Sequence, residues 1–138
     1  MSNRQQVANL LIQVILGIIF LAHGMMKFQS GLDGIAQWFA SIGLPGMLAY
    51  IVAFIEVIGG IFLIIGLGVP YIGMLFTIVM AGAIIKAKLP FGLLGDGTNS
   101  GYEFELALLA MSLYLAVANV KGFVDQRIGK KRGHSANL

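Results

Sequence analysis

Residues 47–67 read MLAYIVAFIEVIGGIFLIIGL, an apolar stretch with one charged side chain, Glu56, near its centre. A helix needs roughly 20 apolar residues to cross a bilayer, so this stretch is long enough to form a membrane span. A carboxylate at that depth costs at least about 2.5 kcal/mol. We therefore expect Glu56 to face protein or water, to pair with a cation, or to stay protonated.

Small side chains share the helix face of Glu56. Ala49 and Ala53 precede it, and Gly59 and Gly60 follow it, at helical spacings of three, four and seven residues. Small residues let helix backbones approach closely in a membrane. This face should therefore receive another helix or a bound molecule.

The composition of the whole chain is that of an integral membrane protein. Of its 138 residues, 58% are hydrophobic and only 11% are charged, whereas a soluble domain carries about 25% charged residues. The length allows a single membrane domain with little outside the bilayer. The chain has no cysteine, which excludes thiol, disulfide, iron–sulfur and thiolate–metal chemistry of its own.

Apolar segments of membrane-crossing length occur four times along the chain. The predicted spans cover residues 7–26, 47–67, 71–89 and 102–120. A basic tail, residues 121–138, follows them and is expected to fray after Arg127. The sequence thus predicts an all-α, four-helix membrane bundle.

The segment between the first two spans has a helical pattern of its own. Its apolar residues recur at i, i+3, i+4 and i+7, namely at Ile35, Trp38, Phe39 and Ile42. This periodicity predicts a short amphipathic helix lying in the membrane interface, with Asp33 as its N-cap and Gly43 at its C-terminal stop. An ordinary loop is the alternative.

The distribution of Lys and Arg predicts the orientation. Four spans place both termini on one side of the membrane. Of nine Lys and Arg residues, only Lys27, Lys86 and Lys88 belong to the two loops on the opposite side, which leaves six on the side of the termini. The positive-inside rule then predicts that both termini are cytoplasmic.

Ionisable side chains gather in the outer half of this predicted bundle. Tyrosines aside, the set at or within the spans comprises His23, Lys27, Glu56, Lys86, Lys88, Glu103 and Glu105. His23 and Lys27 are four residues apart and share a helix face. The alternative for Lys86, Lys88 and Glu103 is that they anchor helix ends at the membrane surface.

Two polar or small stripes continue this pattern along the last two spans. One contains Glu105, Ser112, Ala116 and Asn119, and the other contains Gly73, Thr77, Ala81 and Lys88. A bundle that turns both stripes inward has a polar pocket that opens to the outer side, with Glu56 at its floor. We expect no metal site, because a haem with two axial histidines needs a second membrane histidine and His134 lies in the tail.

The order of three short motifs resembles that of the DoxX family of small four-helix bacterial membrane proteins. These motifs are HGMMK at the end of the first span, IEVIGG in the second and GYE at the start of the fourth. The resemblance covers nearly the whole chain and implies a bacterial cytoplasmic membrane protein. The family's positions carry over to His23, Gly24, Lys27, Glu56, Gly59, Gly60 and either Glu103 or Glu105. Near the end the chain reads ANVKGFVDQRIG, and only Asp125 matches the family's Ser-x-Asp.

What the resemblance implies about function is a link to redox metabolism, as a quinone-linked subunit or as a partner of an oxidoreductase. Our first hypothesis is a subunit that binds a quinone or a similar small apolar redox molecule. Glu56, His23 and Lys27 would then be catalytic, and Glu105, Gly59, Gly60 and Lys88 would bind the cofactor. The alternative is a non-enzymatic membrane scaffold or small carrier that docks a redox enzyme.

The expected partners are the lipid bilayer and a soluble or membrane-bound oxidoreductase. The basic tail favours anionic lipid or an acidic cytoplasmic protein. We expect no nucleic-acid partner. Formation of a homo-oligomer is left open.

Overall fold

The computed structural model describes the backbone of residues 1–135 and the side chains of residues 1–120. Its helices are α1 (Asn3–Ser30), α2 (Leu32–Ser41), α3 (Met47–Ile65), α4 (Val69–Ala83), the π-helix η1 (Ile84–Lys88), the 3₁₀ turn η2 (Leu89–Phe91) and α5 (Glu103–Ser135). No strand occurs in the part of the chain that the structure describes. The prediction of an all-α fold is confirmed.

Four of these helices are long and apolar enough to cross a membrane. They are α1, α3, the continuous helix Val69–Phe91 formed by α4, η1 and η2, and the part of α5 that covers Glu103–Val120. The short helix expected between the first two spans is α2. The prediction that the tail frays after Arg127 is wrong for the backbone, because α5 continues to Ser135. Once a helix exists, each further residue adds one hydrogen bond at little cost.

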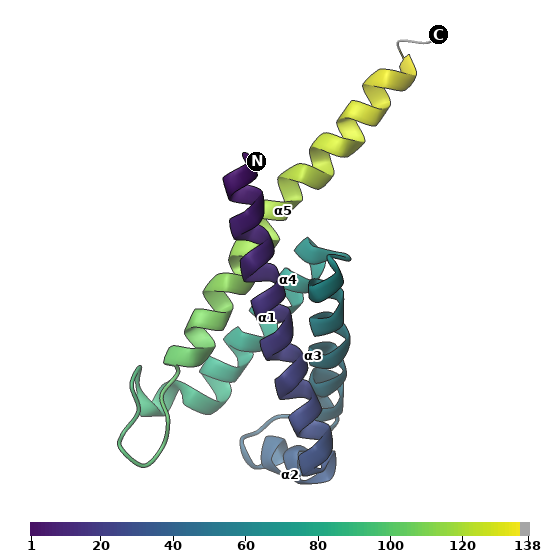
Figure 1. Ribbon diagram of the computed structural model, residues 1–138. Helices are drawn as coiled ribbons and strands as arrows, with labels where there is room; N and C mark the ends of the chain where they lie inside the picture. Colours follow the sequence, from purple (N-terminus) through teal and green to yellow (C-terminus); the bar gives the residue numbers. More distant parts are fainter. Residues whose placement is uncertain (136–138) are drawn as a thin grey trace.

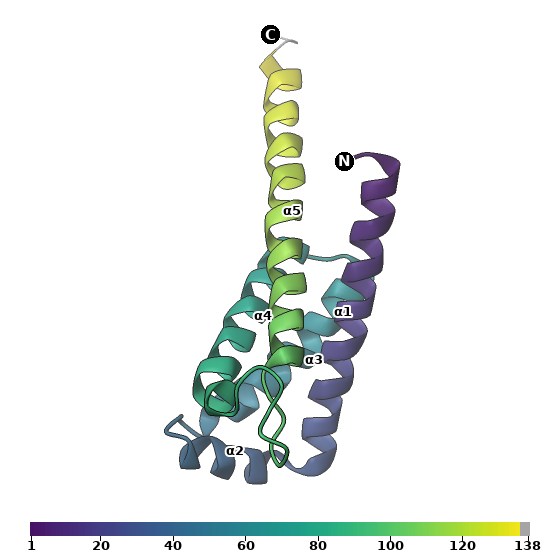
Figure 2. The same cartoon turned by 90° about the vertical axis from the view of Figure 1, so that its left-hand side faces the viewer.

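The chain crosses the bundle four times, in alternating directions (Figure 1). The start of α1, the turn at residues 66–68 and the far part of α5 lie at one end, which we call the termini end. The opposite end carries α2 and the loop of residues 92–102, and we call it the α2 end (Figure 2). The half of the bundle next to each end is named after that end.

Helix α1 packs along α3 through residues without side chains. A Cβ atom on Gly17 would lie 2.8 Å from the carbonyl oxygen of Gly60, and a Cβ on Gly60 would lie 2.8 Å from the backbone nitrogen of Leu21. Real Cβ atoms essentially never approach other atoms so closely. The two backbones can therefore touch only because both positions are glycine, as expected for helices in a membrane.

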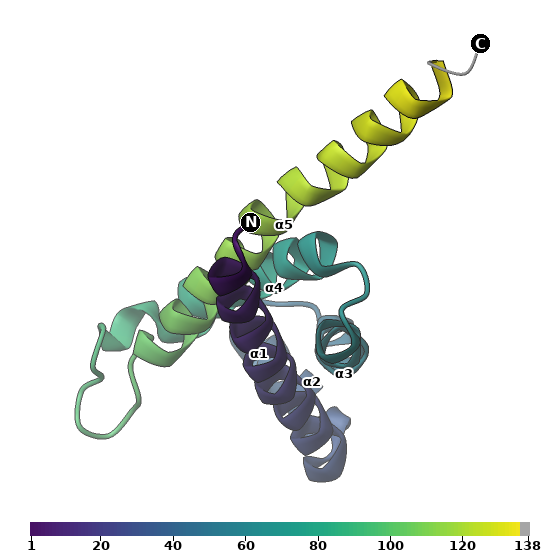
Figure 3. The ribbon, with the colours of Figure 1, turned by 45° about the horizontal axis from the view of Figure 1, so that its top comes forward.

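Helix α4 pairs with α5 in the same manner, so the bundle consists of two helix pairs (Figure 3). A Cβ on Gly73 would lie 2.7 Å from the carbonyl oxygen of Ser112 and 2.8 Å from the nitrogen of Ala116. The predicted inward stripes of the last two spans thus meet each other.

The two pairs join in the termini half through a closely packed core. The rings of Phe20 and Phe76 stack with centroids 3.7 Å apart. Within the α1–α3 pair, Gln13 donates a 2.8 Å hydrogen bond to the carbonyl oxygen of Leu63. Asn9 and Asn119 donate to each other at 3.3 and 3.0 Å. Asn9, Gln13 and Asn119 are therefore satisfied by hydrogen bonds across helices, as burial requires.

Helix α2 lies across the α2 end of the bundle (Figure 2). The prediction that Asp33 is its N-cap is wrong, because the helix begins at Leu32 and the Asp33 carboxylate accepts a hydrogen bond from the Tyr50 hydroxyl. Gly43 does end the helix, with φ of 84°. The next amide, that of Leu44, donates to the carbonyl oxygen of Phe39 at 2.9 Å, which is the Schellman arrangement.

Candidate functional site

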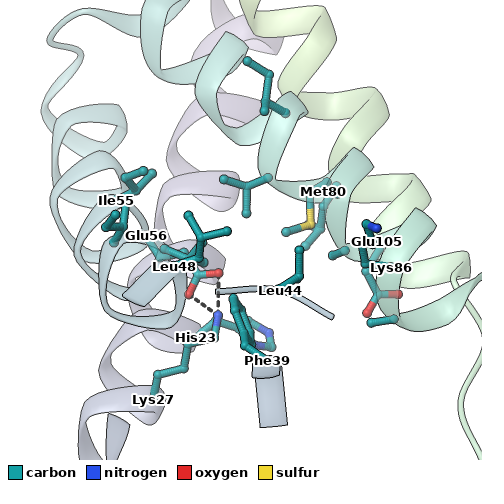
Figure 4. A pocket seen from close by; sticks show the side chains of 18 of the residues that line it. His23, Lys27, Phe39, Leu44, Leu48, Ile55, Glu56, Met80, Lys86 and Glu105 are labelled. Carbon is teal, nitrogen blue, oxygen red and sulfur yellow. Dashed lines mark hydrogen bonds and ion pairs between the residues drawn. The ribbon is translucent and has the colours of Figure 1, made fainter. Parts of the chain in front are cut away.

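A cavity of about 430 Å³ occupies the α2 half of the bundle, between the two helix pairs (Figure 4). Its polar lining residues are His23, Lys27, Glu56, Lys86 and Glu105. The other lining residues are apolar side chains and one glycine. The prediction that His23, Lys27 and Glu105 share a pocket with Glu56 is confirmed. The walls, however, are much more apolar than the predicted polar pocket.

Lys27 and Glu56 form an ion pair across α1 and α3 (Figure 4). The Lys27 ammonium donates to both carboxylate oxygens of Glu56, at 2.6 and 2.5 Å. Only 3% of the Glu56 side chain is exposed, against 24% for Lys27. The sequence predicts that Glu56 could pair with a cation but does not identify it, and in the structure this cation is Lys27. The pair leaves one ammonium N–H of Lys27 available for a ligand.

Gly24 explains why Lys27 reaches so deep a carboxylate. A Cβ on Gly24 would lie 2.9 Å from the backbone nitrogen of Val57 and 3.0 Å from the Cβ of Glu56. The missing side chain lets α1 touch α3 at the level of Glu56. Lys27, three residues and so just under one turn further along α1, then extends back along the shared face.

His23 lies on the same face of α1 and lines the cavity. Its ring centroid is 5.5 Å from that of Phe104 on α5, with the rings tilted at 39°. Among the described side chains, none forms a hydrogen bond with His23. The His23 ring can therefore offer a hydrogen bond to a molecule in the cavity.

Glu105 brings a carboxylate to the opposite wall of the cavity. Its Oε1 atom lies 3.7 Å from the ammonium of Lys88, which also donates to the Ser100 hydroxyl at 2.5 Å. The Oε2 atom of Glu105 is buried and has no hydrogen-bond partner among the described residues. A buried acceptor without a partner costs about 1–3 kcal/mol, so this oxygen favours a ligand that donates a hydrogen bond.

Lys86, rather than Lys88, is the α4-side lysine that lines the cavity. Sequence periodicity placed Lys88 on the inward stripe because it assumed an α-helix throughout the third span. Residues 84–88 instead form the π-helix η1, which has a different number of residues per turn and therefore rotates the side chains that follow it. Nothing in the periodicity of the third span predicts this change.

Gly59 and Gly60 lie at helix contacts and not on the cavity wall. A Cβ on Gly59 would lie 2.7 Å from the Phe76 ring, and Gly60 touches α1 as described above. Both glycines therefore hold the bundle together on the termini side of the cavity. The structure brings together five of the ionisable residues but separates these two glycines from them.

The α2 side of the cavity was also missed by sequence reasoning. Phe39 and Leu44 line it, and the Schellman arrangement at the end of α2 places these two residues next to each other. The amphipathic pattern by itself predicts only a membrane-facing surface. The pair of Phe39 and Leu44 around Gly43 was the available signal.

Fold and site together define a multi-pass helical membrane protein with a buried ion pair inside an apolar cavity. In the described part of the chain, no group of three or more His, Asp or Glu side chains is placed to hold a metal ion.

The chain belongs to the DoxX family, whose profile matches residues 8–89. It is 40% identical over 137 residues to a Bacillus subtilis (strain 168) protein named "Putative oxidoreductase CatD". The aligned region covers 97% of this chain and 98% of that protein. No solved structure matches the chain. The predicted family membership is confirmed.

Proposed function

We propose that this protein is the membrane subunit of an oxidoreductase and that its cavity binds a quinone or a similar small apolar redox molecule. The family and the printed name of the Bacillus relative support a role linked to an oxidoreductase. The observation that carries the ligand proposal is the Lys27–Glu56 ion pair in the wall of an otherwise apolar cavity.

The residues of the cavity suit such a ligand in size and in chemistry. Its volume of about 430 Å³ falls in the range of roughly 300–1,000 Å³ that is common for small-molecule sites. The free N–H of Lys27 and a ring N–H of His23 can donate to carbonyl oxygens. The unpartnered Oε2 of Glu105 can accept from the hydroxyl of a reduced ligand.

A bound quinone would supply the redox chemistry, since it takes up two electrons and two protons to form a quinol. We propose that the electrons come from the redox group of a partner protein, because this chain has no cysteine and its described residues offer no metal site. His23 and Glu56 would hold and pass protons at the cavity wall, and Lys27 would orient the ligand.

We further propose that the termini end faces the cytoplasm. Of the nine Lys and Arg residues, six belong to the termini: Arg4, Lys121, Arg127, Lys130, Lys131 and Arg132. The positive-inside rule then places the cavity in the outer half of the membrane. Reporter fusions after Leu138 and within residues 96–101 should label opposite sides, and labelling of the same side would contradict this topology.

The test of the proposed ligand is mass spectrometry of the small molecules that mildly extracted protein retains. We expect a quinone in the wild-type protein and much less in Glu56→Leu. A variant at a lipid-facing position away from the cavity, Ile61→Phe, is the matched control. Co-purification of a soluble dehydrogenase without any retained quinone would contradict the ligand proposal and favour the scaffold alternative.

A further inference from the structure

A second hollow, of about 470 Å³, lies on the outer surface of the bundle between α3 and α4. Its lining residues are Tyr50, Ile51, Phe54, Ile55, Ile58, Gly59, Ile72 and Leu75. We call this hollow the α3–α4 groove. Ile51 and Ile55 line the groove and the central cavity alike, so the two spaces adjoin at these residues.

The groove follows from the way the helices pair. Each of α3 and α4 packs mainly on its own partner, α1 or α5, through glycines on the faces described above. The two helices meet closely where the ring of Phe76 fills the space left by Gly59. The α3 wall of the groove extends from this contact toward the α2 end, whereas its α4 wall, Ile72 and Leu75, comes just before Phe76 along α4.

The chemistry of the groove suits a hydrocarbon chain and not a head group. Its one polar side chain, Tyr50, already donates its hydroxyl to Asp33. No cation and no other hydrogen-bonding side chain lines it. A molecule seated there must therefore keep its polar part elsewhere, and the adjoining space that carries polar groups is the cavity with Lys27 and Glu56.

We propose that the α3–α4 groove binds the long apolar tail of the molecule whose head group occupies the cavity. The ligand class is then a quinone with a long prenyl tail that enters sideways from the lipid between α3 and α4. This inference rests on the proposed function. In a bilayer the tail exchanges lipid contacts for protein contacts, so the gain comes from packing and should be moderate.

Trp38 provides a built-in reporter for the test. It is the one tryptophan in the sequence and it lines the cavity, where a quinone ring would quench its fluorescence by accepting an electron from the excited indole. The probes are a 1,4-naphthoquinone with a long prenyl tail and the same ring with a methyl group in place of the tail. Both are added to the full chain in phosphatidylcholine nanodiscs and compared at equal mole fraction in the lipid.

We expect the tailed quinone to reach half-maximal quenching at about a tenfold lower mole fraction than the methyl compound, which corresponds to about 1.4 kcal/mol. Equal half-maximal values would overturn the tail site and leave the proposed head-group site intact. Quenching by neither compound would overturn the proposed function, and the tail site with it.

Groove-filling variants locate the tail. Ile58→Phe with Leu75→Phe enlarges two groove residues that are 49% and 41% exposed. The matched control is Ile61→Phe with Met74→Phe, at positions 42% and 49% exposed on the same helices but outside both hollows. We expect only the first pair to remove the advantage of the tailed quinone while leaving the methyl compound unaffected. A tail advantage that survives in the groove-filled variant would place the tail elsewhere and overturn the inference.

Discussion

The two halves of this bundle use the same four helices in opposite ways. In the termini half, glycines bring backbones into contact, Phe20 stacks on Phe76, and polar side chains bond to one another across helices. In the α2 half, the helix pairs separate around a cavity whose charged groups are only partly satisfied. The difference indicates that one half holds the fold, while the other half encloses the cavity in which we propose that the ligand binds.

The largest expected effect is at the Lys27–Glu56 pair. Lys27→Met leaves the Glu56 carboxylate buried without its cation, and breaking a buried pair in this way costs about 3–5 kcal/mol. Glu56→Gln keeps the shape of the side chain and a hydrogen bond to Lys27. We expect normal membrane abundance but no quinone-dependent activity in Glu56→Gln, and low abundance in Lys27→Met, measured by immunoblotting and by enzyme assay in membranes.

The double variant Lys27→Met with Glu56→Leu separates stability from function. It removes both charges, so abundance should recover relative to Lys27→Met while activity stays absent. Full activity of Glu56→Gln and Glu56→Leu at normal abundance would show that the ion pair is not the centre of the site.

A smaller effect is expected in the packed half, at Gly60. Gly60→Ala puts a Cβ 2.8 Å from the Gly17 carbonyl oxygen and from the Leu21 nitrogen, and overpacking of this kind costs about 1–3 kcal/mol. The matched control is Gly34→Ala in α2, where a Cβ meets nothing within 4 Å. Denaturant titration in detergent should show a loss for Gly60→Ala and none for Gly34→Ala. Equal stability of the two variants would remove the distinction between the packed and open regions.

The Asn9–Asn119 contact should contribute less. Hydrogen bonds between membrane helices contribute about 0.6 kcal/mol on average, so Asn119→Leu should lower the free energy of unfolding by about that amount. Quinone retention should stay at the wild-type level, because neither asparagine lines the cavity. A loss of retained quinone without a loss of stability would mean that the packed half also serves the ligand.

The smallest effect concerns the loop at the α2 end. Backbone N–H donation from Asn99 and then Thr98 holds the pKa of the Asp96 carboxyl below its ordinary value. Because that pKa is lower in the folded loop, the stabilisation is present at neutral pH. The stabilisation starts to be lost as the pH falls below the ordinary pKa of about 3.9. It is lost completely once the pH is below the lowered pKa of the folded loop.

Amide chemical shifts of Thr98 and Asn99 should follow this titration by NMR. Asp96→Asn should abolish it and leave the cavity unaffected. A titration midpoint at or above the ordinary value would contradict the lowered pKa.

Much of the fold was predictable because membrane spans depend on the length and apolarity of single segments. Span three illustrates the limit, since a π-helix redirects Lys86 and Lys88. The start of α2 was missed because Asp33 bonds to Tyr50, a residue 17 positions away, instead of capping its own helix. Sequence periodicity describes one helix at a time and contains no information on such contacts between helices.

The candidate site, like the fold, could be predicted only in part. The spacing of His23 and Lys27 placed them on one face, and the isolated charge of Glu56 identified it as exceptional. Their meeting depends on how α1 and α3 rotate against each other, which Gly24 and Gly60 determine through backbone contact. The same glycine contacts explain why Gly60, predicted to bind a cofactor, lies at a helix contact instead.

The stacked rings of Phe20 and Phe76 also have an electrical consequence. A membrane voltage falls mainly across the closely packed part of a protein, which here includes the stack and the core on its termini side. Moving one charge through the full voltage takes about 2.3 kcal/mol per 100 mV. A proton that reaches Glu56 from the α2 end avoids most of this work, whereas one arriving from the termini end would have to do nearly all of it. Under the proposed role of Glu56, its protonation from the α2 end would thus depend little on the membrane voltage.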